Sequence, residues 1–277
     1  MFRIYDTQTR QVVEIGPGPG SVLRLYALDP AHSGPAHAGE FRCFLVADLV
    51  KRNAEHRHGM TVEVYLVVRG AGNDQTPAGD ATALNIRPAE RSVGAPEPGG
   101  PPVATMTPAE IIIEAPLRPG TDQATVRRTV GVGPVTFGGG DVGGSALHHA
   151  PAVSLSDIAD RGLDPLAVRL ALMSRRHAEQ ADLTWDVLSD ADQALRRWRE
   201  QVAEWAESPS KPMCAEVTAQ VTAAFDDDLD TPAALRALRE LENDPQIPPG
   251  SKFESFLNAD QLLALDLPRE IGRPRRS

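Results

Sequence analysis

The stretch from residue 22 to residue 68 constrains the fold more than any other part of the chain. Residues 22–26 (VLRLY) and residues 61–68 (TVEVYLVV) have the composition of short, buried strands. Between them, apolar residues recur every three or four positions over residues 41–56, which predicts a helix. A strand, a loop, a helix and a second strand make a βαβ unit. We therefore expect an α/β fold with a parallel sheet.

Two further segments predict strands, residues 111–113 (III) and residues 130–137, the latter as a strand or a hairpin edge. Residues 70–108 are crowded with Gly, Pro, Ala and Thr, a composition that predicts a long loop or linker. A loop of this length inside a compact domain suggests a remodelled or excised insertion. A second glycine-rich stretch, GGGDVGG, occupies residues 138–144.

The pattern becomes helical from Ser154 onward. Ser154 or Ser156 can cap a first helix, and Pro165 suits the first position of the next. Residues 185–205 form a long amphipathic pattern whose three tryptophans share one stripe and are most simply core. Further helices are expected at residues 215–225, from Thr231, and at residues 253–265. The second half is therefore predicted to be an all-helical bundle.

Charge and cysteine content narrow the function classes. The chain has 28 basic and 38 acidic side chains, for a net charge of −10, which disfavours DNA and extended RNA surfaces. Cys43 and Cys214 lack the spacing of a disulfide framework or a cysteine-rich metal site. There is no apolar run long enough for a bilayer and no signal-peptide pattern at the start. We expect a cytoplasmic protein with no membrane contact.

Four segments resemble the cysteinyl-tRNA synthetases and the related mycothiol ligases. The opening RIYDTQTRQVVEI resembles the start of those proteins, and residues 26–42 (YALDPAHSGPAHAGEFR) resemble their YVCGPTVYDYAHIGNAR without a gap. Residues 164–198 are similar to the helices that follow the catalytic domain, and residues 225–238 (FDDDLDTPAALRAL) to the C-terminal helical domain. The chain is identified as a shortened, divergent member of this group.

The resemblance implies a class I synthetase fold. A Rossmann-type, catalytic-like domain is expected over residues 1–160, with residues 70–108 in place of the family's tRNA acceptor insertion. A helical bundle is expected over residues 161–277. The family's reaction joins ATP and an amino acid into an aminoacyl adenylate, whose acyl group passes to tRNA or to an amine.

The family's HIGH-type motif falls on residues 37–40. His37 matches a histidine that contacts ATP phosphates in relatives, and Gly39 matches a glycine that lets adenine pack on the backbone. Glu40 departs from the pattern, because a carboxylate is repelled by a triphosphate unless a divalent cation bridges them. Two interpretations stay open, a nucleotide contact or a loop histidine without a ligand.

The family's second motif, KMSKS, follows a strand such as GPVTF, which this chain has at residues 133–137. Aligned from Phe137, the motif falls on a degenerate loop that contains Asp141, Gly144 and Ser145. Aligned back from the next helix, it falls a few residues later. Either way, no lysine lies between Lys51 and Lys211, so the ammonium groups that stabilise the transferring phosphate are absent. The arginines that could replace them, nearest before the loop, are Arg127 and Arg128.

The family's zinc site maps onto side chains that cannot bind zinc. Its first cysteine maps to Leu28, and its WHIEC motif resembles residues 111–115 (IIIEA), which puts Ala115 on the second. His148 and His149 resemble a family histidine pair but lack the glutamate that follows it. We expect no zinc, with Leu28, Glu114 and Ala115 lining the substrate pocket. Glu114 is either a substrate contact or, more simply, a solvent-facing carboxylate at a strand end.

Three hypotheses about function follow from these losses. The favoured one is a degenerate synthetase that binds a small ligand, with weak ATP·Mg²⁺ binding and without tRNA. The alternative is a working ATP-dependent, adenylate-forming ligase that joins an amino acid to a small amine or other non-tRNA acceptor. A third is a protein partner or regulator of another enzyme. The acidic run Asp226–Asp227–Asp228 is interpreted most simply as a solvated helix end.

Overall fold

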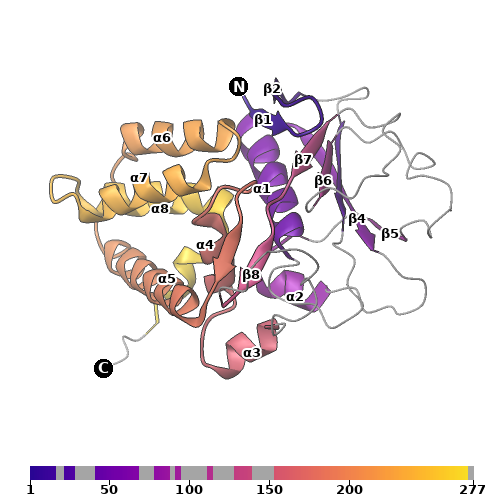
Figure 1. Ribbon diagram of the computed structural model, residues 1–277. Coiled ribbons are helices and arrows are strands. Elements are labelled where there is room, and N and C mark those ends of the chain that lie inside the picture. The colour runs from indigo at the N-terminus through magenta and orange to yellow at the C-terminus, as the bar shows by residue number, and fades with distance from the viewer. Residues whose placement is uncertain are drawn as a thin grey trace.

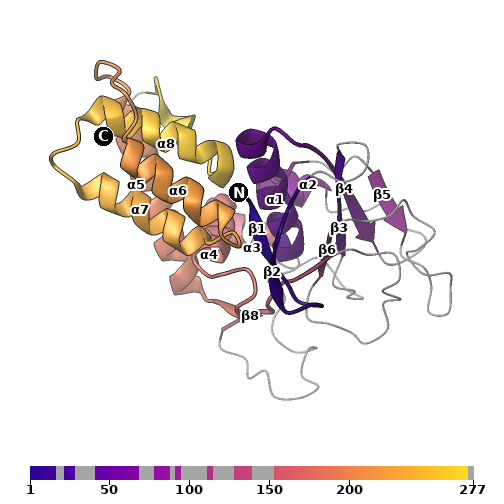
Figure 2. The same ribbon diagram turned by 90° about the horizontal axis from the view of Figure 1, so that it is seen from above.

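A computed structural model describes residues 1–16, 22–28, 41–68, 78–87, 91–94, 111–114, 128–138 and 153–273. Helix α1 (Phe41–His58) lies between a β-sheet on one side and a group of helices on the other (Figures 1 and 2). The mixed α/β architecture predicted from the sequence is confirmed. No described helix combines the length and the apolar character that crossing a membrane requires.

The main sheet has five strands in the order β5-β4-β3-β6-β7, and all its described pairs are parallel. The strands are β3 (Val22–Leu28), β4 (Thr61–Val68), β5 (Arg91–Gly94), β6 (Ile111–Glu114) and β7 (Thr129–Gly131). The chain starts in the centre at β3, moves outward through β4 and β5, and returns to β6 on the other side of β3. The strand order therefore reverses between β3 and β6.

Helix α1 packs on one face of this sheet. Alternate residues of three strands, including Leu25 of β3, Val64 of β4 and Ile113 of β6, are buried, and α1 contacts all three strands. The period of two in the strands and the apolar residues of α1 explain this layer. The sequence pattern at residues 61–68 predicted β4 with the bounds that the structure has.

An N-terminal hairpin covers the β7 edge of the sheet. It consists of β1 (Arg3–Asp6) and β2 (Gln11–Glu14), paired antiparallel. Beyond β1, the Thr7 amide donates to the carbonyl oxygen of Thr129 at 2.8 Å, and Asp6 Oδ1 accepts from the Thr129 amide at 3.0 Å. The backbone groups of Thr129 on the open side of β7 are thus satisfied.

The second half is mostly helical, as predicted. Ser154 caps the first helix with a complete capping box, which decides between the two serines considered. Two tryptophans of α5, Trp198 and Trp205, are core as predicted and pack edge-on against Phe256 of α8, whereas Trp185 is only partly buried and packs against Phe137. The helices are α3 (Leu155–Asp160), α4 (Leu166–Met173), α5 (Trp185–Trp205), α6 (Ala215–Asp226), α7 (Thr231–Asn243), α8 (Pro249–Leu263) and the 3-10 helix η3 (Leu267–Glu270).

The loop prediction for residues 70–108 is wrong at two places. Helix α2 (Ala78–Ala83) and strand β5 lie within this stretch. Alanines favour the helix, and β5 forms because it pairs with β4, from Tyr65 opposite Arg91 to Val68 opposite Gly94. Pairing with a distant strand supplies the backbone hydrogen bonds that a loop-like composition does not reveal.

Two other predictions need correction. Residues 130–137 are not one strand, because β7 belongs to the main sheet and β8 (Val135–Phe137) pairs in parallel with β9 (Ala181–Leu183). Pro134 lies between β7 and β8, and proline cannot donate to a continuous ladder. Strand β9 also interrupts the region that was predicted to be all-helical, since β8 offers it a partner.

Candidate functional site

The carboxyl edge of the main sheet, where β3 and β6 meet, is the candidate site. Tyr26 pairs with Ile112 and Ala27 with Ile113, so the next residues, Leu28 and Glu114, end neighbouring parallel strands. This is also the point at which the strand order reverses. Open parallel sheets bind ligands in the crevice outside such a reversal point. The structure thus brings the backbones of two predicted pocket residues together.

The other predicted site residues lie outside the described residues. This applies to Ala115 of the pocket, to both signature motifs and to the paired histidines: His37, Gly39, Glu40, Asp141, Gly144, Ser145, His148 and His149. Their roles stay predictions. The structure does place what flanks them, since α1 starts directly after Glu40 and β8 ends four residues before Asp141.

The chemistry of the predicted donor positions does not fit zinc. Leu28 and Ala115 carry aliphatic side chains, which supply no ligand atom. Within the residues that the structure describes, no group of three or more His, Cys, Asp or Glu side chains could hold a metal ion. The zinc content of the protein stays a prediction for elemental analysis.

Arg42, in the first turn of α1, is a buried cation that contacts the connection between β7 and β8. Its side chain donates to the carbonyl oxygen of Gly133 at 2.9 Å and lies 3.5 Å from that of Pro134. It also donates to the carbonyl oxygens of Arg176, at 2.8 Å, and Glu179 in the segment between α4 and β9. Burial lowers the pKa of the Arg42 guanidinium to about 10.

Gly133 is held in the same contact. A Cβ atom added there would lie 2.1 Å from the carbonyl oxygen of Glu179 and 2.7 Å from that of Ala178. The Gly133 amide donates to the carbonyl oxygen of His177 at 2.7 Å, and the Ala181 amide to that of Pro134 at 2.9 Å. Only glycine allows this backbone approach. Sequence reasoning matched Gly133 to the family's GPVTF strand but missed Arg42, although Arg42 ends the matched segment 26–42.

A second buried arginine joins α1 to the helical part. Arg169 of α4 is fully buried and donates to Asp48 Oδ2 of α1 at 2.7 Å and to the carbonyl oxygens of Leu263 and Leu84. Arg52 donates to the same Asp48 oxygen at 2.8 Å. Burial acts to raise the pKa of Asp48, but the charges of Arg169 and Arg52 hold it below its usual value.

The acidic run after α6 is not a solvated helix end, as the sequence interpretation had it. Asp226 Oδ1 lies 2.7 Å from His58 Nε2, and Asp228 accepts from the Tyr5 amide at 2.8 Å and lies 3.1 Å from His177 Nε2. The backbone takes left-handed angles at Asp228 and Leu229, with φ of 58° and 51°. This turn directs successive carboxylates to different neighbours, and only Asp227 stays largely exposed.

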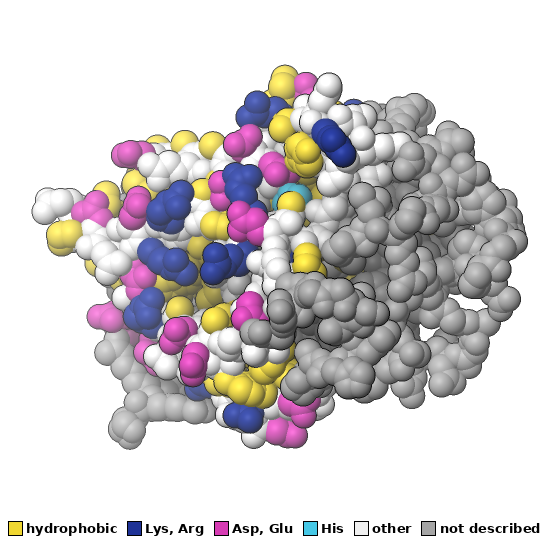
Figure 3. Space-filling view, in the orientation of Figure 1, with side chains coloured by type: hydrophobic (Ala, Val, Ile, Leu, Met, Phe, Trp, Pro, Cys, Tyr) yellow, Lys and Arg dark blue, Asp and Glu magenta, His cyan; other side chains and the backbone are white. Residues whose placement is uncertain are grey.

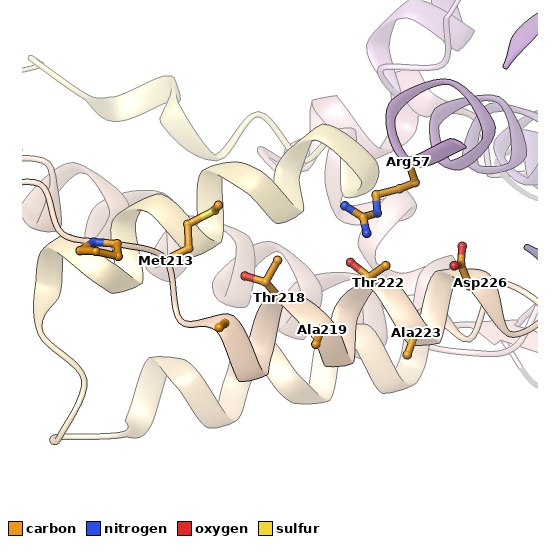
Figure 4. A pocket seen from close by; sticks show the side chains of 9 residues that line it. Arg57, Met213, Thr218, Ala219, Thr222, Ala223 and Asp226 are labelled. Atoms are coloured by element: carbon orange, nitrogen blue, oxygen red, sulfur yellow. The ribbon is translucent and has the colours of Figure 1, made fainter. Parts of the chain in front are cut away.

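An open groove of about 670 Å³ follows α6 (Figure 4). Met213, Thr218 and Thr222 line it, and Arg57 points toward it from the last turn of α1. This end of α1 lies roughly 25 Å along the helix axis from Phe41, where α1 meets the carboxyl edge of the sheet. The groove contains no predicted site residue and is separate from the candidate site.

Acidic and basic side chains are interspersed over the helical part on the face shown in Figure 3. The ion pairs of the helical part include Arg196 with Asp192 at 2.6 Å and Arg197 with Glu242 at 2.8 Å. A mixed surface of this kind creates no extended positive field. Among the described residues of this face, the electrostatic footprint of a polyanion-binding surface is therefore absent.

Comparison with characterised proteins matches part of the chain to L-cysteine:1D-myo-inositol 2-amino-2-deoxy-alpha-D-glucopyranoside ligases. The Streptomyces griseus protein is 40% identical over 86 residues, 31% of this chain and 20% of the relative. The Mycolicibacterium smegmatis protein is 36% identical over 119 residues, 42% of this chain and 28% of the relative. The matched segments thus span only about a fifth to a quarter of the relatives' length.

Other comparisons add little. No protein-family profile matches the chain. Among solved structures, a putative arginyl-tRNA synthetase from Campylobacter jejuni is similar over 91% of this chain and 92% of its own, with 10% sequence identity and a TM-score of 0.48. Over the matched segments, the chain is similar to L-cysteine:1D-myo-inositol 2-amino-2-deoxy-alpha-D-glucopyranoside ligases, the mycothiol ligases of the cysteinyl-tRNA synthetase-like group that its motifs resemble.

Proposed function

We propose that this synthetase-like protein binds a small ligand at the carboxyl edge between β3 and β6 and has lost amino-acid activation. The observation that carries the proposal is the pairing of β3 with β6, which sets Leu28 beside Glu114 at the reversal point of the sheet. The resemblance implies that the synthetases and ligases of this group carry zinc-binding thiolates at the positions equivalent to Leu28 and Ala115. An edge with aliphatic residues there offers a place for a ligand but no zinc to select a thiol.

The charges of the signature motifs support the loss of activation. Glu40 stands in the first motif, Asp141 is assigned to the second, and neither motif has a lysine. At an effective dielectric near 20, two unit charges about 4 Å apart interact by on the order of 4 kcal/mol before screening. Exchanging attraction for repulsion at two places therefore costs several decades in triphosphate affinity or in rate, since each 1.4 kcal/mol or so is tenfold.

The ligase hypothesis is the second candidate, and the comparisons favour it. The matched relatives are named as ligases of L-cysteine and an amino sugar, so an amine acceptor fits the same fold. In this case Arg127, Arg128 or a divalent cation would have to replace the lysines. The net charge of −10 disfavours an extended RNA-binding surface, so the acceptor of such a ligase would not be tRNA.

Calorimetry with ATP·Mg²⁺, AMP and adenosine tests the proposal, together with ATP–pyrophosphate exchange over all amino acids. We expect no exchange, and AMP and adenosine binding at least as tightly as ATP. Glu40→Gln and Asp141→Asn provide matched controls, because removing each charge should raise ATP affinity and leave adenosine affinity unchanged. Exchange with any amino acid, or ATP binding much tighter than adenosine, would replace this proposal with the ligase hypothesis.

A further inference from the structure

The carboxyl edge of the sheet has a third strand beside the candidate site. Glu114, the last residue of β6, pairs with Gly131, the last residue of β7. The chain then runs through Val132 to Gly133, whose carbonyl oxygen accepts from Arg42. The strand next to Glu114 is therefore fixed, two residues past its end, by the first turn of α1.

Arg42 holds this connection without forming an ion pair in the described part of the chain, although the charge of the Glu179 carboxylate acts to raise its pKa. Its hydrogen-bond acceptors are main-chain carbonyl oxygens from two segments, residues 133–134 and residues 176–179. The side chain is 2% exposed. Burying a guanidinium without a counter-ion carries a desolvation penalty, which neutral carbonyl groups offset only in part. An arginine at this position therefore gains little net stability. Its planar fork of donors, however, defines the direction and distance of the carbonyl groups around it.

We propose that Arg42 is a positioning residue of the candidate site, which fixes the β7 side of the carboxyl edge relative to the start of α1. The first turn of α1 follows the HIGH-like residues, and β8 leads into the KMSKS-equivalent residues. Arg42 therefore connects α1, which follows the first signature segment, to the link between β7 and β8. Strand β7 borders Glu114, and β8 precedes the second signature segment. This inference rests on the proposed function for its ligand and on the described hydrogen bonds for its geometry.

The test compares Arg42→Ala and Arg42→Lys with Arg169→Lys, which alters another buried arginine that donates to carbonyl oxygens. Adenosine is the probe, measured by calorimetry well below each melting temperature. Both Arg42 variants should bind adenosine about tenfold more weakly or worse, as is typical when a supporting hydrogen bond to a site is lost. Arg169→Lys should lower the melting temperature and leave the adenosine affinity of the folded protein unchanged.

Chemical rescue separates positioning from general damage. Guanidinium at low millimolar concentration should restore adenosine affinity to Arg42→Ala, whose four carbonyl oxygens remain, and should not change the wild type or Arg169→Lys. Unchanged affinity in Arg42→Ala overturns the proposal. An equal loss of affinity in Arg169→Lys also overturns it, because the effect would then follow stability and not position.

An experiment that needs no ligand distinguishes a failure of the positioning role of Arg42 from a failure of the proposed function. If the wild type binds no adenosine, AMP or ATP, the proposed function fails. Amide hydrogen exchange over residues 129–137 then decides the role of Arg42. Faster exchange there in Arg42→Ala, slowed again by guanidinium and unaltered in Arg169→Lys, supports positioning of this segment. Exchange equal to that of the wild type contradicts it.

Discussion

The regions around Arg42 and Arg169, two of the buried arginines of this protein, compensate the buried positive charge differently. At the junction of α1, α4 and the end of α8, Arg169 lies against the carboxylate of Asp48, which also accepts from Arg52. At the carboxyl edge of the sheet, Arg42 donates to main-chain carbonyl oxygens. The first region balances charge within the core, and the second uses a cation to set the position of neighbouring backbone.

This difference separates stability from geometry. A buried ion pair becomes a liability when one partner is lost, because the other charge stays buried. A guanidinium among carbonyl groups leaves no ion behind when it is removed, but its acceptors lose their donor. We therefore expect substitutions near Arg169 to change mainly the unfolding free energy. Substitution of Arg42 should change mainly the ligand affinity of the candidate site. Four predictions probe this contrast.

The largest effect is expected for Gly133→Ala, which attacks the geometric region through its backbone. The new Cβ would lie 2.1 Å from the carbonyl oxygen of Glu179, so the two segments must separate. We expect a loss of more than about 4 kcal/mol in unfolding free energy, or no folded protein. Urea denaturation measures it, with Gly16→Ala as control, since a Cβ there meets nothing within 4 Å. Equal stability of both variants would show that this contact is not tight.

The second prediction concerns the charge-balanced region. Asp48→Ala leaves Arg169, which is fully buried, without its carboxylate. The expected loss is about 3–5 kcal/mol in unfolding free energy. Arg273→Ala is the matched control, because the side chains of the ion pair Arg273–Glu270 are 57% and 37% exposed, and its loss should cost less than about 1 kcal/mol. A cost for Asp48→Ala as small as that of the control would remove the contrast drawn above.

The third prediction is a pH dependence of stability that originates at Asp228. Burial acts to raise the pKa of Asp228, but its hydrogen bonds to His177 and the Tyr5 amide hold it below the usual value. A depressed folded-state pKa means that this stabilisation is complete above the unfolded-state pKa of about 3.9 and is lost as the pH falls below it. Asp228→Asn should cost about 2 kcal/mol at pH 7 and flatten the acid side of the stability curve. An unchanged acid limb would exclude Asp228 as its source.

The smallest effect is expected one residue earlier in the same acidic run. Arg3 and Asp227 form an ion pair at 2.9 Å, but their side chains are 52% and 57% exposed. Exposed pairs contribute roughly 0–1 kcal/mol. Asp227→Asn should therefore change the unfolding free energy by less than about 1 kcal/mol and leave the acid limb intact. A larger loss would mean that the exposed fraction of a side chain does not predict which carboxylates of this run stabilise the protein.

The sequence was sufficient where a local period decides the structure. The run of β-type residues in β4 and the three-and-four spacing of α5 predicted both elements with correct bounds. It was insufficient for β5, whose strand state depends on pairing with β4, and for the acidic run, whose neighbours Tyr5, His58 and His177 are 223, 168 and 51 residues away. The motif mapping placed Leu28 and Glu114 in one pocket, which the strand register supports at the backbone level. No local pattern marks Arg42, because its acceptors are distant main-chain atoms.

The N-terminal hairpin has a consequence for self-association. An uncovered sheet edge presents free amide and carbonyl groups, which can template strand addition by another molecule. Here Asp6 and Thr7 occupy the backbone groups of Thr129 on the open side of β7. Without residues 1–14, these groups of Thr129 would be exposed, so we expect the hairpin to limit strand addition by a second copy at this edge.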